Sequence, residues 1–109
     1  LMECVILNLT QNALRFARSA VNISLACTDE LYTITVDDDG PGVPKEERER
    51  VFQSFVRLSN SSNGKSRGFG LGLAIVRRIV KWHGGDVTAA MSELNGARFI
   101  VQWPVLSGR

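Results

Sequence analysis

The chain has 109 residues, of which 44% are hydrophobic and 22% are charged, as is typical of one globular domain. The 13 Lys and Arg residues exceed the 11 Asp and Glu residues by only two, so the charge predicts no nucleic-acid partner. No apolar run approaches the roughly 20 residues that a membrane span needs, and we expect the chain to be soluble. Its two cysteines, Cys4 and Cys27, lack the spacing and the companion histidines of a zinc site, so we expect buried, reduced thiols.

Residues 1 to about 18 are predicted to form a helix. One side of it carries residues at spacings of four, three and four, as a helical face requires: Val5, Leu9, Asn12 and Phe16. Asn8 and Asn12 lie on this side, where an amide is costly to bury unless it is paired. They could simply cap or bridge elements of the core. Alternatively, Asn12 could offer a neutral oxygen to Mg²⁺, with Arg15 contacting a phosphate and Phe16 packing near a base.

Residues 21–26 and 31–36 alternate apolar and polar side chains, which predicts two strands that each bury one face. The short polar link at 28–30 suits a hairpin. The second strand then runs into the sequence Asp38-Asp39-Gly40-Pro41-Gly42, whose glycines allow positive φ and close approach of the backbone. The simpler interpretation is a turn after a strand. The functional one is that the Asp38 carboxylate accepts a hydrogen bond from an adenine amino group.

Residues 45–58 predict a short charged helix, and residues 59–68, rich in Ser, Asn and Gly, predict a mobile loop. A further helix opens at Gly70-Leu71-Gly72 and ends at His83-Gly84-Gly85. Glycines at 68, 70 and 72 leave backbone N–H groups at the positive end of the helix dipole, which suits a phosphate. A flexible hinge is the structural alternative. The run is neither a P-loop, because no GK[ST] follows, nor a dinucleotide-binding fingerprint.

Residues 86–92 and 97–103 predict a last hairpin of two strands. Strands that arrive in pairs with helices between the pairs indicate an α+β fold. We therefore expect a two-layer α/β sandwich, with a mixed, mostly antiparallel sheet covered on one face by three helices.

Four of these runs occur in the order found in the histidine-kinase branch of the GHKL ATPase superfamily, which the chain strongly resembles. The runs are the N box at 8–16 (NLTQNALRF), the G1 box at 38–44 (DDGPGVP), the F box at 52–57 (FQSFVR) and the G2 box at 68–76 (GFGLGLAIV). Together they extend over most of the chain. Taken singly each is weak, but four in order make chance resemblance negligible.

The resemblance implies that residues 1–109 form the ATP-binding catalytic domain of a bacterial two-component sensor kinase. Such a domain binds Mg-ATP and donates the γ-phosphoryl group to a histidine on a separate dimerisation and phosphoacceptor domain. A cognate response regulator is the further partner implied for the parent protein. The family also suggests a cytoplasmic domain of an inner-membrane sensor.

Site residues carry over position by position. The positions that match the family's nucleotide contacts are Asn8, Asn12, Arg15, Phe16, Asp38, Gly40, Gly42, Val43, Phe55, Arg57, Lys65, Arg67, Gly68, Gly70, Leu71 and Gly72. Among them Asn8, Asn12 and Arg15 are the implied catalytic set, with Asn12 as the Mg²⁺ ligand. Asp38 is the implied acceptor for the adenine amino group, and residues 57–68 are the implied ATP lid, from which a basic side chain reaches the γ-phosphate.

The gyrase and MutL branches carry a glutamate that activates water at the position of Asn8. Asparagine cannot act as that base, which favours phosphoryl transfer to a protein residue over hydrolysis. An anti-sigma-factor serine kinase shares the four boxes, but the F box and the long lid make it the weaker alternative. A module that senses or binds nucleotide without transferring phosphate is the third interpretation.

Three features depart from the family pattern. The helix pair that carries the phosphoacceptor is missing, and His83, in its HGG stop, is not expected to replace it. The first strand of the family's sheet is also missing, which would leave an edge or an apolar surface open to strand exchange or dimerisation. Finally, Gly96-Ala97-Arg98 stands where many relatives have Gly-Thr or Gly-Gly, with no functional consequence expected.

Overall fold

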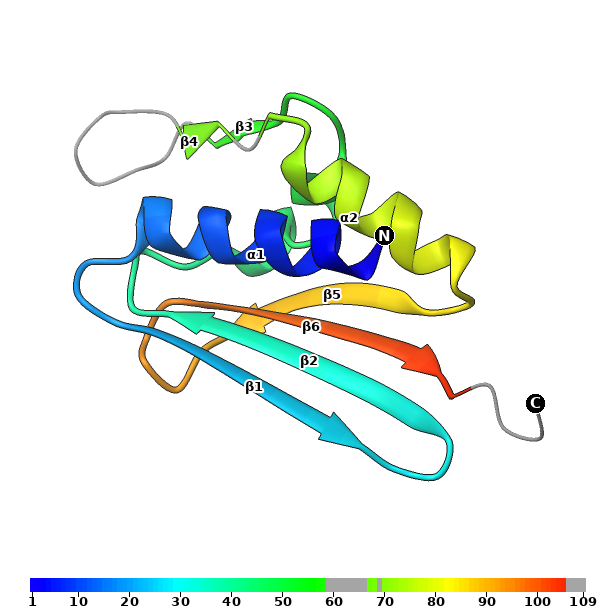
Figure 1. The fold of residues 1–109 in the computed structure, drawn as a ribbon. Coiled ribbons are helices and arrows are strands. Elements are labelled where there is room, and N and C mark those ends of the chain that lie inside the picture. Colours follow the sequence, from blue (N-terminus) through cyan, green and yellow to red (C-terminus); the bar gives the residue numbers. More distant parts are fainter. Residues whose placement is uncertain (59–66, 69, 106–109) are drawn as a thin grey trace.

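The computed structural model describes residues 1–58, 67–68 and 70–105. Figure 1 shows the elements in chain order. They are α1 (Met2–Phe16), β1 (Val21–Cys27), β2 (Leu31–Asp38), the 3₁₀ turns η1 (Lys45–Glu47) and η2 (Arg50–Phe52), β3 (Arg57–Leu58), β4 (Arg67–Gly68), α2 (Gly72–Trp82), β5 (Asp86–Met91) and β6 (Ala97–Pro104).

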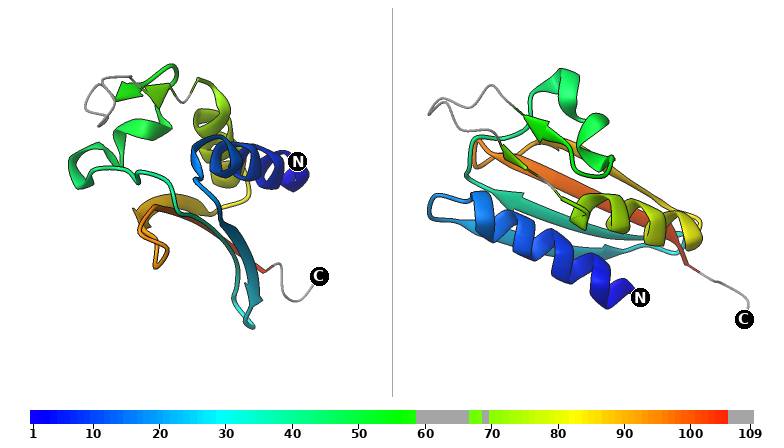
Figure 2. Two further views of the ribbon diagram at one scale, coloured as in Figure 1. Left: turned by 90° about the vertical axis from the view of Figure 1, so that its left-hand side faces the viewer. Right: turned by 90° about the horizontal axis from the view of Figure 1, so that it is seen from above.

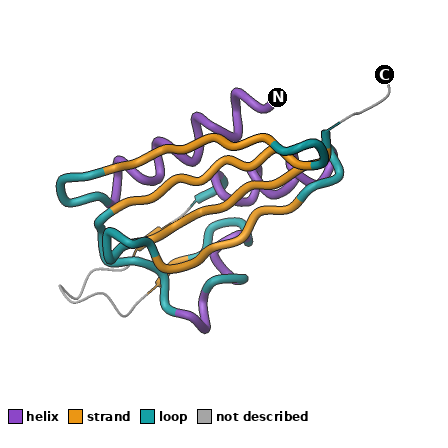
Figure 3. The backbone as a smooth tube through the Cα atoms, turned by 90° about the horizontal axis from the view of Figure 1, so that it is seen from below, coloured by secondary structure: helices purple, strands orange, loops and turns teal. Residues whose placement is uncertain are grey.

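The main sheet has four strands in the order β1-β2-β6-β5, and every pairing in it is antiparallel. β3 and β4 form a separate two-stranded ribbon. The helices cover one face of the main sheet (Figure 2). In the view from below, the strands lie in front and the helices lie behind them (Figure 3). The opposite face carries no helix in the described part of the chain. This arrangement confirms the predicted α+β sandwich.

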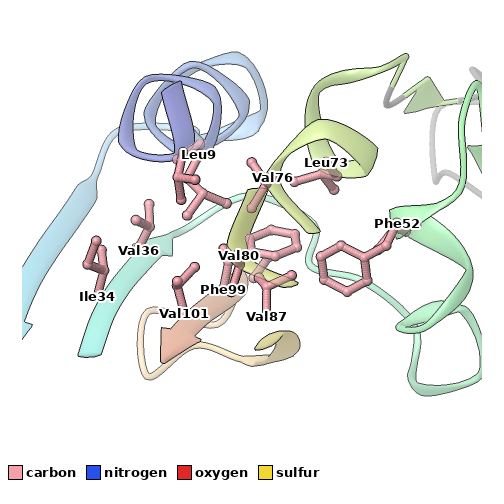
Figure 4. Close-up of a cluster of buried hydrophobic side chains, with 14 of the residues drawn as sticks. Leu9, Ile34, Val36, Phe52, Leu73, Val76, Val80, Val87, Phe99 and Val101 are labelled. Atoms are coloured by element: carbon pink, nitrogen blue, oxygen red, sulfur yellow. The ribbon is translucent and has the colours of Figure 1, made fainter. Parts of the chain in front are cut away.

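The core lies between the helices and the sheet (Figure 4). Each layer contributes fully buried aliphatic or aromatic side chains: Val5, Leu9 and Ala13 from α1, Leu73, Val76 and Val80 from α2, and Val36, Val87, Phe99 and Val101 from the strands. The α1 residues recur every four positions, so they form one helical stripe. Phe52 of η2 meets Phe99 edge to face, with ring centroids 6.0 Å apart, and so joins the 3₁₀ segment to the sheet.

The single helix predicted for residues 45–58 is wrong. The structure has the two 3₁₀ turns η1 and η2, followed by β3. Residues 45–50 are all charged, so this part of the segment has no apolar stripe to bury, and the buried Val51, Phe52 and Val56 all lie after it. Phe55, with a φ of 60°, has a backbone conformation that no right-handed helix allows.

The buried face predicted for residues 21–26 is also wrong. β1 is an edge strand, and Ile23 and Leu25 remain 43% and 71% exposed. The reason is that α1 packs against α2 and, among the strands of the main sheet, against β2 rather than β1. The cysteines are free, as predicted, but both are exposed, because Cys4 lies on the outer side of α1 and Cys27 ends the edge strand.

Candidate functional site

A pocket of about 320 Å³ lies between α1 and the start of α2. It is lined by Asn8, Gln11, Asn12, Arg15, Gly70, Leu71, Gly72 and Leu73. Two segments that are about sixty residues apart in the sequence therefore form one site. The structure brings together Asn8, Asn12 and Arg15 of the first box with the glycine-rich turn of the fourth.

Asn8 connects the two walls of the pocket. Its side-chain N–H donates to the carbonyl oxygen of Cys4 at 2.8 Å, one turn earlier in α1. The amide is thus paired within its own helix. Its oxygen lies so close to α2 that a Cβ on Gly72 would be 3.2 Å from it. A glycine at position 72 therefore lets the second helix begin beside this amide.

The first residues of α2 offer anion-binding groups to the pocket. Gly70 has a φ of +56°, and Leu71, the N-cap residue, provides no side-chain hydrogen bond to the first turn. The opening N–H groups of a helix carry partial positive charge and have no partner within the helix. Across the pocket, the guanidinium of Arg15 stacks over the Phe16 ring at 5.0 Å. The pocket thus combines amides, helix N–H groups and a cation, a set suited to phosphate.

A second part of the predicted site lies at the end of β2. Asp38 is 2% exposed, and its Oδ1 accepts hydrogen bonds from the N–H of Gly40 at 2.8 Å and of Ala97 at 3.2 Å. The backbone of Gly96 lies against the same residue, because a Cβ at position 96 would be 2.2 Å from the Asp38 carbonyl oxygen. Gly42 in turn approaches Gly96, since a Cβ on Gly42 would be 3.3 Å from the Gly96 carbonyl.

Sequence reasoning missed Gly96 and Ala97, for which no functional consequence was expected. They orient the buried carboxylate through backbone groups alone, so the identity of their side chains gives little signal. The signal that could have identified them is the strand order. Because β6 pairs with β2, residue 98 lies opposite residue 37, and the residues just before 98 come next to Asp38.

The end of α1 joins the two parts. A Cβ on Gly40 would be 2.3 Å from the carbonyl oxygen of Phe16, so the loop after β2 passes directly against the last turn of α1. Asp39 fixes the residues that follow α1. It accepts hydrogen bonds from the N–H of Arg18 at 2.7 Å and from the N–H and hydroxyl of Ser19 at 3.0 and 2.8 Å. The bonds from Ser19 hold the pKa of Asp39 far below its usual value.

The remaining predicted residues are placed as follows. Asp38, Gly40 and Gly42 do not line the 320 Å³ pocket. Val43 is buried in the core. The Phe55 ring is 71% exposed, but its backbone N–H donates to the carbonyl oxygen of Gly70 at 2.8 Å, which ties the F box to the pocket wall.

The predicted lid falls largely outside the described residues, Lys65 included. Arg57, Arg67 and Gly68 are described only as backbone of the ribbon formed by β3 and β4.

Residues 1–107 match the family described as "Histidine kinase-, DNA gyrase B-, and HSP90-like ATPase". The chain belongs to this ATPase family. The resemblance stated from the four boxes is thereby confirmed.

Relatives within the family are sensor kinases. The chain is 49% identical over 105 residues to Sensor protein RstB of Escherichia coli (strain K12). This match covers 96% of this chain and 24% of RstB. The segments LRFA at 14–17 and SELNGARF at 92–99 indicate the same likeness. Sensor histidine kinase CpxA of the same strain is 40% identical over 104 residues, covering 95% of the chain and 23% of CpxA. The chain thus spans about a quarter of the length of these relatives.

Solved structures agree with this membership of the ATPase family. The mycobacterial sensor histidine kinase MprB matches with a TM-score of 0.78 and 30% identity, covering 93% of this chain and 70% of that one. Full-length ShkA, solved in complex with AMPPNP, matches with a TM-score of 0.77 and 32% identity, covering 94% of this chain and 21% of that one. In the described part of this ATPase domain, no helix has the length and apolar character to cross a membrane.

Proposed function

We propose that this ATPase domain binds Mg-ATP and donates the γ-phosphoryl group to a histidine on a phosphoacceptor domain of the same two-component sensor protein. A cognate response regulator would then take the phosphoryl group from that histidine. The observation that carries the proposal is the pocket in which two asparagine amides of α1 face the glycine-rich start of α2. The relatives support it by name, since CpxA is a sensor histidine kinase and ShkA was solved with an ATP analogue.

The pocket itself is the proposed triphosphate site. Residues 70–72 would donate backbone N–H groups to the phosphates, and Arg15 would neutralise part of their charge. Residues 57–68 are proposed as the lid over this site, from which Arg57, Lys65 or Arg67 would reach the γ-phosphate.

Asn12 is the proposed Mg²⁺ ligand, with Asn8 beside it. Mg²⁺ takes oxygen ligands and in nucleotide sites keeps most of its coordination for phosphate and water, so one neutral amide oxygen fits its needs. Among the described residues, no three His, Cys, Asp or Glu side chains gather as an all-protein metal site. The ion would neutralise charge on the phosphate oxygens when bound.

The end of β2 is the proposed adenine site. The Asp38 carboxylate is held in place by two backbone N–H groups on its Oδ1, and a fixed carboxylate is an acceptor that suits the adenine amino group. Gly40 and Gly42 would allow the base to approach the backbone, with Phe16 and Phe55 as apolar neighbours of the nucleotide.

The lining of the triphosphate pocket favours transfer over hydrolysis. Its described residues include amides, glycines, leucines and one arginine, and none is a carboxylate or a histidine. None of them can take a proton from water at neutral pH. Positioning and charge neutralisation are what the pocket supplies, and phosphoryl transfer to a protein side chain requires little more.

The test is calorimetric titration of the chain with AMPPNP, with and without Mg²⁺. Asp38→Asn is the sharpest variant, because the asparagine oxygen still accepts the two backbone hydrogen bonds while its NH₂ group opposes the adenine amino group. We expect roughly 10- to 150-fold weaker binding, from the loss of one hydrogen bond to a charged group. Asn12→Ala should remove the dependence on Mg²⁺ while leaving Mg²⁺-free binding intact.

Binding by the unmodified chain then makes transfer of ³²P from ATP to a supplied phosphoacceptor domain the next measurement. Binding without transfer would leave a nucleotide-binding module only. A folded chain that does not bind AMPPNP at all would contradict the proposal.

A further inference from the structure

Arg77, in the middle of α2, contacts three residues in two other parts of the fold. Its Nη2 donates to Oε1 of Glu49 at 2.9 Å, and its guanidinium carbon lies 4.8 Å from the centre of the Phe52 ring. Its Nε lies 3.7 Å from Oδ1 of Asp86, at the start of β5. A single side chain thus links α2 to the η2 segment and to the sheet.

These contacts require an arginine. The planar guanidinium can lie over an aromatic ring, donate an N–H to one carboxylate and stay within ion-pair distance of a second, which a lysine ammonium cannot do from one position. The Arg77 side chain is 26% exposed, and its Nε is a buried nitrogen for which no hydrogen-bond partner is found among the described residues. The side chain is therefore held by its surroundings although one donor is left unsatisfied, which is costly unless the contacts compensate for it.

The η2 segment leads directly to the pocket. Phe52 is 4% exposed and fixed between Arg77 and Phe99. Three residues later, the N–H of Phe55 donates to the carbonyl oxygen of Gly70 at 2.8 Å, and Gly70 lines the pocket. Figure 4 shows Phe52 reaching from this segment toward the core. The position of the Gly70 wall consequently depends on where the 50–55 segment lies relative to α2.

We infer that Arg77 is a positioning residue for the triphosphate half of the site. It does not line the pocket. It acts by holding residues 49–55 against α2, so that the Phe55 N–H keeps the Gly70 carbonyl, and with it the N–H groups of residues 70–72, in place for the phosphates. This inference rests on the proposed function, because it assigns Arg77 a part in binding the same nucleotide.

The test compares two substitutions that each remove one negative charge from the same short segment of the whole chain. Glu49→Gln breaks the pair with Arg77, whereas Glu47→Gln breaks the 2.8 Å pair with Arg50, which stays within the 3₁₀ turns. Arg77→Met and Arg77→Lys complete the set. Each variant is titrated with AMPPNP and with AMP, and hydrogen exchange reports the protection of the Phe55 amide.

We expect Arg77→Met to weaken AMPPNP binding about tenfold and Glu49→Gln about threefold, with Arg77→Lys in between, as losing a cation–π contact and a partly exposed ion pair implies. AMP binding should stay within about twofold, because the buried Asp38 site does not depend on this segment. Glu47→Gln should change neither ligand. Phe55 should lose protection in Arg77→Met and Glu49→Gln while the amides of α1 keep theirs.

Two results overturn the inference. Unchanged AMPPNP affinity and Phe55 protection in the folded Arg77 and Glu49 variants would show that the segment is positioned without Arg77. Equal loss of AMP and AMPPNP affinity would show a general structural role. If Arg77→Met does not fold, Arg77→Lys and Glu49→Gln carry the test. If the unmodified chain binds neither ligand, the proposed function fails, and Phe55 protection still decides whether Arg77 positions the segment.

Discussion

Replacing Gly96 by alanine tests whether the site depends on how closely β6 approaches Asp38. An ideal Cβ at position 96 would be 2.2 Å from the Asp38 carbonyl oxygen, 2.5 Å from its Oδ1 and 2.6 Å from the Gly40 nitrogen. Such gaps are roughly 1 Å shorter than nonbonded contacts allow, so Asp38 must move away, and crowding of this kind costs about 1–3 kcal/mol of stability. If the proposed hydrogen bond from adenine to the carboxylate is lost, about 1.5–3 kcal/mol of binding goes with it, and Kd for AMPPNP should rise about 10- to 150-fold.

Gly84→Ala is the matched control. Gly84 follows α2, far from the pocket, and its φ of +80° is strained for alanine although the nearest atom, in the Pro104 side chain, would be 3.5 Å away. The substitution should cost about 1–2 kcal/mol of stability, similar to Gly96→Ala, without changing Kd. Urea denaturation gives the stabilities and calorimetry gives the affinities. A folded Gly96→Ala chain that binds like the original would refute the reasoning, and so would equal loss of affinity in Gly84→Ala.

Two further predictions concern stability at low pH and self-association. Hydrogen bonds from Ser19 lower the folded-state pKa of Asp39 from its ordinary 3.8, so the carboxylate contributes stability above that pH and loses it as the pH falls toward the folded value. Urea denaturation at several pH values below about 5 should therefore show a steeper loss for the original chain than for Asp39→Asn, and equal slopes would contradict the assignment. The groove of about 360 Å³ that contains Ile6 and the 71%-exposed Leu25 predicts concentration-dependent self-association, which Leu25→Lys should reduce in sedimentation velocity. An original chain that stays monomeric at every concentration would contradict this.

Much of the fold could be predicted because local patterns and tertiary packing agree. The period of two in residues 31–36 and the stripe through Val5 and Leu9 each mark a side that the structure buries, and residues 21–26 of β1 are the exception. The exception shows what periodicity omits. Alternation says that a strand has an apolar side, but whether a helix covers that side depends on where α1 crosses the sheet. The same limit explains Cys4 and Cys27, whose general preference for interiors is overridden by their positions on an outer helix side and an edge strand.

The site was predictable to the extent that it is encoded in contiguous runs. The first and fourth boxes contain the residues that line the pocket, and the Asp38 run contains the buried carboxylate. What the runs do not contain is the set of backbone contacts between them. The bond from Ala97 to Asp38 joins residues 59 positions apart, and it exists only because β6 pairs with β2. The role proposed for Arg77 could not be predicted from the sequence for the same reason, since its partners lie in two other parts of the fold.

The two halves of the proposed nucleotide site differ in how they are supported, and this difference implies different roles. The adenine half is fixed by glycine backbones packed at contact distance and by hydrogen bonds to a buried carboxylate, so a small displacement there has no room to relax. The phosphate half has one wall on α1 and another that begins at Gly70, where a Cβ would meet nothing within 4 Å and the bond from Phe55 supplies the connection. Substitutions in the first half should therefore weaken nucleotide binding more strongly than substitutions behind the second half. An adjustable phosphate half is what a domain needs if its γ-phosphate must be held firmly and then presented to a histidine on another domain.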